Sequence, residues 1–435
     1  FLDSMTCAGS GGFADNDCVF FCAPTHTLER LFLLRDGDTI FVSNSMVFAL
    51  VAAGDDIDVE YPFYNHDFAS VIDGIDKYVR AVPTSAGRKL EQYYCCNLSV
   101  SRDLQIEVGH KNQPAKFSDY SDYAGFLQSS VDRLCANATD KGRHKAYMPL
   151  ATVSSGYDSP AAAVLAERAG CRDALTFATA REDFESRDDS GEKIGEKLGM
   201  AVQSFDRTEY LHLADLPEAE FLATGMGGED VVMRAFEGAL ADSVLFTGFH
   251  GDKVWQYDNK KAAKTIVRGD ASGSSLGEFR LRVGFIHLPI PFIGCLQHPS
   301  INEIGMSENM DDWYLRRDTR AGRIYNRPIP RRIAEEGGVP RDWFGQNKRA
   351  VTQPLAFVPR EAWLSNQPLD NLLSEGSLSD FRQYLEKISP APAKRHPAFS
   401  LLHLIYRVNQ SIAWRLSGKF KTWFPRAEKL IMLHW

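Results

Sequence analysis

Residues 148–170 place a cluster of small polar residues between an apolar, β-prone run and an Ala-rich run. Ser154, Ser155, Gly156, Asp158 and Ser159 lie at this junction. Where a parallel strand ends and a helix begins, backbone N–H groups converge, and their partial positive charge suits a phosphate. Small residues let the backbone approach such a ligand, hydroxyls add donors, and aspartate is a hard oxygen ligand for Mg²⁺. The pattern predicts a phosphate site with a magnesium ligand, and a plain capped helix start is the alternative.

A second polar loop of similar character follows a later apolar run. The stretch VLFTGFHGDKVW, residues 244–255, carries two glycines and Asp252 after its β-prone residues. From residue 148 onward strands alternate with helices. Strands are predicted at 148–153, 173–180, 200–205 and at the start of 242–255, and helices up to about 169 and over 188–199. This alternation is typical of a parallel sheet with crossover helices, so both polar loops are expected at the same sheet edge.

The first part of the chain is predicted to be rich in β-strands. Residues 30–50 contain an Asp-Gly hairpin signal at 36–38, and a second strand-like run covers 90–101. The polar connector at 110–122 precedes a run with helical spacing at 122–138, so we predict two domains, 1–115 and 116–435. The Gly/Ser-rich stretch 256–279 predicts a mobile loop, and the last hundred or so residues predict mainly helices.

Composition favours an ordinary globular protein and disfavours several partners. The chain has 435 residues, and 49 Lys and Arg stand against 57 Asp and Glu, which gives a formal net charge of −8. This balance disfavours a broad grip on nucleic acid or on an anionic membrane, and no apolar run is long enough to span a bilayer. The eight cysteines show no paired zinc-ligand spacing, so we expect buried reduced thiols and a cytoplasmic protein.

The first loop resembles a known nucleotide-binding motif. Its S-x-G-x-D-S spacing is similar to the S-G-G-x-D-S pyrophosphate-binding loop of the N-type ATP pyrophosphatases, with Ser155 in place of the first glycine. The second loop resembles the G-x-G-x-D-E loop of asparagine synthetases and their relatives. The resemblance implies that Mg²⁺ is shared by Asp158 and Asp252. It also implies ATP-binding roles for the two loops and for the strand end near 177, which comprise Val153, Ser154, Ser155, Gly156, Asp158, Ser159, Phe177, Ala178 and Gly248.

The resemblance extends to both ends of the chain. The segment at 325–351 is similar to a late segment that delivers a lysine to the active site of asparagine synthetase-like enzymes, which implies a catalytic role for Lys348. Residues 34–45 and 70–94 resemble the class II glutamine amidotransferase domain of the same enzymes. That chemistry needs an N-terminal cysteine, whereas this chain starts with Phe1. We expect a degenerate glutaminase-like domain, as in β-lactam synthetases, and a truncated sequence is the rival explanation.

Several positions depart from the family pattern. Phe249 stands where asparagine synthetases have a glutamate and β-lactam synthetases a tyrosine, so His250 becomes the candidate catalytic base, against a structural histidine as the alternative. Lys253 replaces the usual glutamate. The stretch 280–301 lies where the similar enzymes carry R-V-P-F-L-D, and their aspartate is absent here. Its Arg282, His287 and His298 lie among apolar residues and are candidates for recognising a substrate carboxylate or phosphate, with satisfied core histidines as the alternative.

These features lead to one expected fold and reaction. The fold class is α/β, with a β-rich, glutaminase-like α+β domain followed by a Rossmann-like parallel-sheet domain of the ATP pyrophosphatase type and a helical C-terminal part. The expected protein is an ATP- and Mg²⁺-dependent ligase that adenylates a small-molecule carboxylate and joins it to an amine. Two alternatives are an enzyme that modifies a nucleobase or tRNA and an inactive nucleotide-binding scaffold. The substrates, a separate ammonia source and a homo-oligomeric state stay open.

Overall fold

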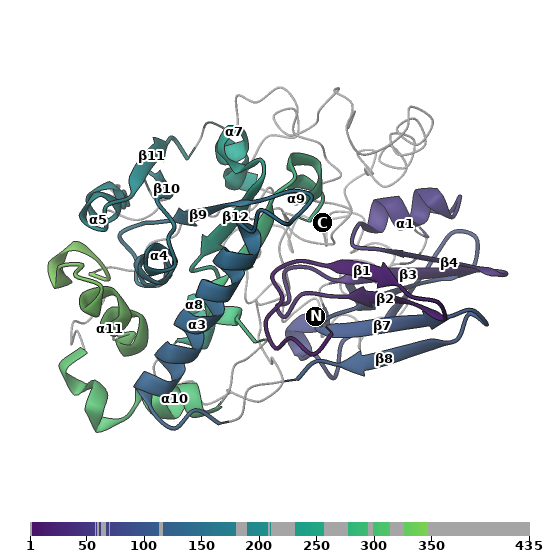
Figure 1. Cartoon of the computed structure of the whole chain (residues 1–435), viewed down its shortest axis with the longest axis horizontal. Coiled ribbons are helices and arrows are strands. Elements are labelled where there is room, and N and C mark those ends of the chain that lie inside the picture. Colours follow the sequence, from purple (N-terminus) through teal and green to yellow (C-terminus); the bar gives the residue numbers. More distant parts are fainter. Residues whose placement is uncertain are drawn as a thin grey trace, which may run out of the picture.

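The computed structural model describes residues 2–56, 58, 61, 67–68, 70–112, 116–179, 189–207, 209, 231–255, 277–294, 299–313 and 326–346. These residues form a mixed α/β structure with one five-stranded parallel sheet and two four-stranded antiparallel sheets, which lie on opposite sides of Figure 1. The expected α/β class is therefore confirmed at this level. Lys348, His298 and most of the predicted loop at 256–279 and of the predicted C-terminal helices lie outside the described residues.

The two antiparallel sheets are built from the first 110 residues. One has the order β1-β2-β7-β8, and the other has the order β4-β3-β6-β5. Their strands are β1 (Gly11–Ala14), β2 (Cys18–Cys22), β3 (Leu31–Asp36), β4 (Thr39–Ser43), β5 (Ala81–Pro83), β6 (Lys89–Tyr93), β7 (Cys96–Ser101) and β8 (Ile106–His110). The predicted hairpin is confirmed, because β3 pairs with β4 across Gly37, which adopts a φ of 55°.

Side-chain alternation along β3 explains how the antiparallel layers pack. Leu31 and Leu33 face a core shared with Leu98 of the other sheet. Phe32 and Leu34 point the opposite way, into a second core with helix α1 (Met46–Ala52). Helix α1 and the two sheets therefore stack in layers. Successive side chains of β3 point to opposite faces, and each face is covered by another layer. The single strand expected over 90–101 is wrong, because the chain turns at Cys95 (φ 51°) and divides between β6 and β7 in different sheets.

The parallel sheet follows the predicted alternation. Its order is β11-β10-β9-β12-β13, and every neighbouring pair is parallel. The strands are β9 (Met148–Thr152), β10 (Asp173–Phe177), β11 (Ala201–Phe205), β12 (Ser243–Thr247) and β13 (Ile286–Pro289). The last of these was not expected from the sequence. The remaining helices are α3 (Tyr120–Ala138), α4 (Asp158–Arg168), α5 (Glu192–Lys197), α7 (Glu237–Leu240), α8 (Gly251–Val254), α9 (Gly277–Val283), α10 (Pro299–Gly305) and α11 (Pro328–Glu336), and short 3₁₀ turns cover 70–73, 231–236, 290–292, 308–313 and 341–343.

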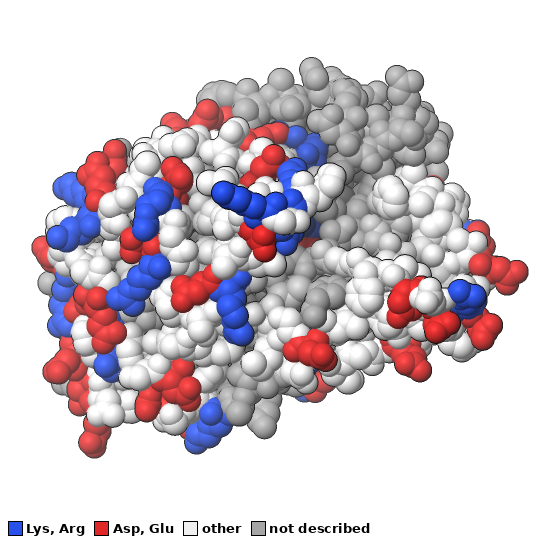
Figure 2. All heavy atoms as spheres, in the orientation of Figure 1, with Lys and Arg blue, Asp and Glu red and all other residues white. Residues whose placement is uncertain are grey.

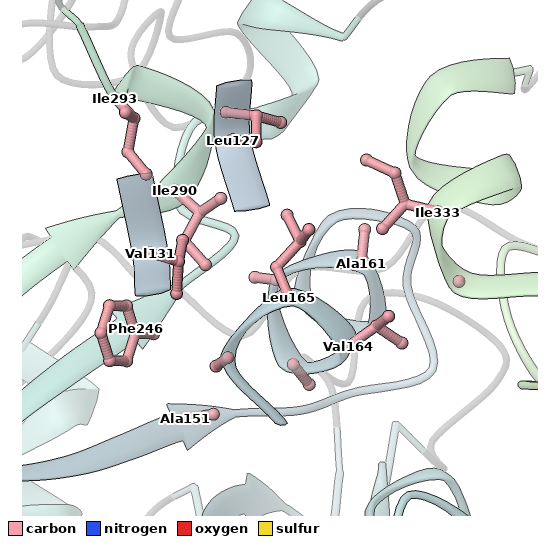
Figure 3. Packing of buried hydrophobic residues seen from close by; sticks show 14 of the residues in the cluster. Leu127, Val131, Ala151, Ala161, Val164, Leu165, Phe246, Ile290, Ile293 and Ile333 are labelled. Carbon is pink, nitrogen blue, oxygen red and sulfur yellow. The ribbon is translucent and has the colours of Figure 1, made fainter. Parts of the chain in front are cut away.

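Helix α4 lies at the centre of the largest core. Its Ala-rich sequence leaves small side chains on every side, so the helix packs against the sheet, α3 and α11 at once. Figure 3 shows Leu165 and Val164 of α4 between Leu127 and Val131 of α3 and Ile333 of α11. Because α4 is held on all sides, its first turn has a fixed position at the edge of the sheet.

The antiparallel sheets also contact the parallel sheet. Ala8 belongs to the same core as α4, and Gly9 packs on Ile286 of β13. A buried ion pair joins Glu29 to Arg280 of α9 at 3.1 Å. The segment that precedes β1 is therefore fixed between the two parts of the molecule.

The molecular surface carries charges of both signs (Figure 2), and most of the described cysteines are free thiols. On the face drawn in Figure 2, basic and acidic residues alternate over the parallel-sheet part. In the described part of the chain, no helix has the length and apolar character needed to cross a membrane. Six described cysteines are free thiols, whereas Cys95 is disulfide-bonded. The expectation that all cysteines are reduced is therefore wrong at Cys95.

Candidate functional site

The two predicted loops lie side by side at one edge of the parallel sheet. The first loop (residues 153–159) follows β9, and the second loop (residues 248–252) follows β12, which pairs in parallel with β9. A Cβ atom built on Gly248 would lie 2.3 Å from the carbonyl carbon of Asp158, and one on Gly251 would lie 2.5 Å from its Cγ. Real Cβ contacts are not this short, so only glycines allow the second loop to pack on the start of α4.

The first loop gathers hydroxyl groups at the N-terminus of α4. The Oγ atoms of Ser154 and Ser159 are 2.8 Å apart, and the backbone N–H of Gly156 donates to Ser154 Oγ at 3.3 Å. Ser155 adopts no positive φ, so serine at the position of the family's first glycine is accommodated without left-handed strain. The loop therefore keeps the polar character predicted from its sequence.

Ser155 is held by a residue that the sequence did not reveal. Its Oγ donates to Asp189 Oδ1 at 2.8 Å, and its N–H donates to the Asp189 carbonyl at 3.2 Å. A Cβ on Gly191 would lie 2.5 Å from the carbonyl carbon of Val153, so this glycine allows the start of α5 to approach the loop. The sequence pattern placed Asp189 within a predicted helix (188–199), so it carried no signal for this contact. Asp189 thus fixes the shape of the first loop.

A second unpredicted residue binds the carboxylate of Asp158. Arg327 Nη1 donates to Asp158 Oδ2 in an ion pair, and the arginine is largely buried. Arg327 immediately precedes Pro328 at the first position of α11, so the arginine is fixed by a helix that packs on α4. A buried guanidinium adds positive charge next to the loop and orients the carboxylate.

The second loop brings Asp252 close to the same point. Gly251, which contacts Asp158, is followed directly by Asp252 in the single turn of α8. Lys253 Nζ lies 3.3 Å from Asp252 Oδ2, so this lysine forms an ion pair within the loop. Among the described residues, no group of three or more His, Cys, Asp and Glu side chains gathers as a metal cluster.

His250 occupies a strained position between aromatic rings. It adopts a left-handed backbone with a φ of 57°, which a non-glycine residue adopts only at some cost. Its ring lies 4.3 Å from the ring of Phe249 and 5.5 Å from that of Phe292. The structure therefore fixes the ring at the edge of the second loop.

Of the residues singled out in 280–301, His298 lies outside the described residues, and Arg282 and His287 make separate contacts. Arg282 donates to Glu237 at 2.6 Å and lies against Phe279. His287, on β13, contacts Thr247 Oγ1 through Nε2 at 2.8 Å, and its ring lies 5.7 Å from that of Phe249. His287 therefore lies under the second loop, whereas Arg282 contacts Glu237 and Phe279.

The strand end near 177, for which the resemblance implies ATP binding, is already bonded within the chain. The ring of Phe177 stacks on Phe236 with centroids 4.2 Å apart. The N–H of Ala178 donates to the Phe205 carbonyl at 3.1 Å, and its C=O accepts from the Asp189 N–H at 3.2 Å. Ala178 thus links the strand end to the residue that holds the first loop.

Comparison with known proteins gives no family assignment. No protein-family model matches the chain, and no curated protein matches it.

The close approach of Gly251 to Asp158 gives a testable prediction. Replacing Gly251 by alanine would force a methyl group against the Asp158 side chain, and such overpacking costs about 1–3 kcal/mol. We expect the G251A variant to unfold at a lower urea concentration. The matched control is G238A, because Gly238 is exposed on α7 with nothing within 4 Å of the built Cβ. Equal stability of G251A and the wild type would contradict the contact.

The buried imidazole of His287 predicts a pH dependence of stability. Burial first, and then the nearby His26, Arg280 and His250, lower its pKa to about 3. The unfolded chain takes up this proton near pH 6.5, so stability is lost as the pH falls from 6.5 towards 3, at about 1.4 kcal/mol per unit. In urea unfolding at pH 7 and pH 5, we expect the wild type to lose about 2 kcal/mol more than H287Q, whose amide can still bind Thr247. Parallel losses would refute the assignment.

Proposed function

We propose that the protein is an ATP- and Mg²⁺-dependent ligase that adenylates a substrate carboxylate and joins the acyl group to an amine. The observation that carries the proposal is the contact between the two loops, in which Gly248 and Gly251 pack directly on Asp158. A polar, serine-rich loop at the N-terminus of a fixed helix, with a second carboxylate-bearing loop against it, suits a polyphosphate bound with a cation. The resemblance of both loops to those of asparagine synthetases supplies the reaction class.

The donor set fits Mg²⁺. This cation prefers hard oxygen ligands and is commonly held by one or two carboxylates together with waters and substrate phosphates. Asp158 and Asp252 would supply the two carboxylates from adjacent loops. Bound there, Mg²⁺ would neutralise charge on the phosphate oxygens of ATP as pyrophosphate departs.

The chain's own residues have separable roles in this proposal. The N–H groups at the start of α4 and the hydroxyls of Ser154 and Ser159 bind the β- and γ-phosphates. Asp189 keeps Ser155 in place and so preserves the shape of the loop. The guanidinium of Arg327 holds the Asp158 carboxylate and adds positive charge beside the phosphates.

The proposed reaction has two steps, adenylation of the carboxylate and attack by the amine. A carboxylate oxygen of the substrate attacks the α-phosphorus of ATP, and the bond to the pyrophosphate leaving group breaks. The amine then attacks the acyl carbon, AMP departs and the amine loses a proton. His250 is the proposed acceptor of that proton, because its ring is fixed at the edge of the second loop between Phe249 and Phe292.

The test is an assay for substrate-dependent release of AMP and pyrophosphate. The protein is incubated with ATP, Mg²⁺ and a panel of amino and hydroxy acids with amine donors, and products are followed by mass spectrometry. AMP formation that depends on an acid supports the proposal. AMP formation that depends on tRNA would indicate instead an enzyme that modifies a nucleobase or tRNA. ATP binding without AMP formation under all conditions would indicate an inactive nucleotide-binding scaffold.

A lysine outside the described residues supplies a further prediction. By resemblance, Lys348 stabilises charge at the reacting phosphorus, so K348A should bind ATP within about threefold of the wild type yet form AMP at least about a hundredfold more slowly. Nucleotide titration and single-turnover assays separate the two effects. Loss of ATP binding with a normal chemical step would assign this lysine to the nucleotide instead.

A further inference from the structure

A pair of cysteines lies beside a buried lysine in the antiparallel part of the molecule. The sulfur atoms of Cys7 and Cys22 are 3.4 Å apart. Lys111 Nζ, just after β8, lies 2.9 Å from Cys22 Sγ and 2.7 Å from Asn97 Oδ1. The two thiols come from the segment before β1 and from the end of β2 (Figure 1), so a bond between them would join two separate stretches of backbone.

The position of Cys7 is fixed by backbone contacts. Its N–H donates to Thr25 Oγ1 at 2.9 Å, and its C=O accepts from the Thr25 N–H at 2.9 Å. The next residue, Ala8, accepts a hydrogen bond from His26 at 2.9 Å. Hydrogen bonds of the backbone on both sides of Cys7 therefore hold its sulfur next to that of Cys22. To form a disulfide, the two sulfurs have to move closer, to a bond length of about 2.05 Å.

The electrostatics favour a thiolate in this pair. Lys111 is only 9% exposed, and its described hydrogen-bond acceptors are Cys22 Sγ and Asn97 Oδ1. The hydrogen bond with Cys7 and then the contact with Lys111 lower the pKa of Cys22 to about 6, although burial acts in the opposite direction. The same pairing raises the pKa of the Cys7 thiol. One proton is thus shared between two sulfurs, and the negative charge is balanced by the ammonium.

We propose that Cys7, Cys22 and Lys111 form a peroxide-reactive dithiol site that closes reversibly to a Cys7–Cys22 disulfide. The Cys22 thiolate attacks one oxygen of hydrogen peroxide, the O–O bond breaks, and the departing hydroxide takes a proton from Lys111 to leave as water. The Cys7 sulfur then attacks the Cys22 sulfenic acid, its thiol proton leaves with the hydroxyl as a second water, and the S–S bond forms. Two thiols are oxidised and one peroxide is reduced.

The burial of the Cys22 sulfur favours a small oxidant such as hydrogen peroxide over a peptide disulfide. Cys22 is fully buried, whereas its neighbour Cys7 is partly exposed. Hydrogen peroxide is small enough to pass a partly exposed thiol, whereas a peptide disulfide has to place its own sulfur against the buried thiolate. We therefore expect peroxide to oxidise the pair at least about tenfold faster than oxidised glutathione at equal concentration and pH 7.

The experiment maps the bond in the full chain. The protein is treated with a few equivalents of hydrogen peroxide at pH 7, alkylated and cleaved before aspartate residues. This cleavage places Cys7 and Cys22 on different peptides, with Cys18 beside Cys22 on the second. We expect the two peptides to be linked, with loss of two hydrogen atoms, and to be separated again by a thiol reductant. The link should persist in C18S, which is the matched control.

The role of the lysine is tested by rate. Because the Lys111 ammonium supplies part of the lowering of the Cys22 pKa and also the proton that the departing hydroxide takes, K111M should oxidise at least about tenfold more slowly than the wild type. In C7S, oxidation should stop at a Cys22 sulfenic acid that dimedone traps once the chain is unfolded in its presence. A linkage through Cys18, no linkage at all, an unchanged rate in K111M or no trapped sulfenic acid in C7S would each overturn the proposal.

Discussion

Replacing Asp158 by asparagine is expected to lower AMP-forming turnover by at least about a thousandfold. The substitution keeps the size of the side chain but removes the charge that would hold Mg²⁺ against the phosphates. Gly248 and Gly251 pack against this residue, so the asparagine cannot move aside to let another group take its place. Replacing Asp252 should produce a loss of similar size, because Asp252 would be the second ligand of the same cation.

The two variants should differ in stability, which provides a control within the site. The sequence alone suggests that removing either aspartate relieves repulsion between two carboxylates and leaves the fold unharmed. The structure changes this expectation for Asp158, because its replacement breaks the ion pair with the buried guanidinium of Arg327. D158N should therefore be destabilised by up to about 3 kcal/mol, and D252N, whose partner is the more accessible Lys253, by less than about 1 kcal/mol.

Turnover and stability are measured on the same preparations. Pyrophosphate release reports the reaction, and urea unfolding reports the fold. D103N serves as the matched control, since Asp103 is an exposed carboxylate in the turn between β7 and β8 and should change neither quantity. Full turnover in D252N would remove the magnesium assignment whatever the stability results.

The positions of the two loops could be predicted because the signals are local. The switch from apolar β-prone residues to small polar residues marks where β9 and β12 end, and the alternation of strands and helices indicates that the strands are parallel. Parallel strands share one edge for their carboxyl ends, and β9 and β12 are in fact neighbours in the sheet. The sequence pattern therefore predicts that Asp158 and Asp252 lie at the same edge of the sheet, as they do in the structure.

The residues that hold these loops could not be predicted, because their contacts join distant parts of the chain. Asp189 reaches Ser155 across 34 positions, and Arg327 reaches Asp158 across 169. Periodicity and capping signals describe at most the nearest turns of the backbone, so they carry no information about such partners. The same limit applies to β13, whose few residues give too short a pattern to distinguish a strand. It also applies to Lys111, which reaches Cys22 across 89 positions because β2, β7 and β8 are neighbours in one sheet.

A second large effect is expected at Arg331, which lies fully buried in α11. Its Nη2 donates to Tyr157 Oη at 2.7 Å, and its Nη1 donates to Glu335 Oε1 at 3.0 Å. The guanidinium carbon lies 4.8 Å from the centre of the Tyr157 ring and 5.0 Å from that of Phe344. One cation therefore binds two aromatic faces, a hydroxyl and a carboxylate, and it holds the residue that directly precedes Asp158.

Replacing Arg331 by methionine is expected to lower the free energy of unfolding by about 3 kcal/mol. Methionine fills most of the volume, but it leaves the buried Tyr157 hydroxyl without this donor and removes the cation between the two rings. Glu335 keeps a second partner, Arg341, at 2.8 Å, so the loss should centre on Tyr157 and the first turn of α4. Urea unfolding of R331M is compared with that of R133M, in which the exposed Arg133 of α3 is replaced and little change is expected. If R331M is as stable as R133M, Arg331 does not anchor the first loop; if it is destabilised, faster amide exchange at 157–161 should accompany the loss.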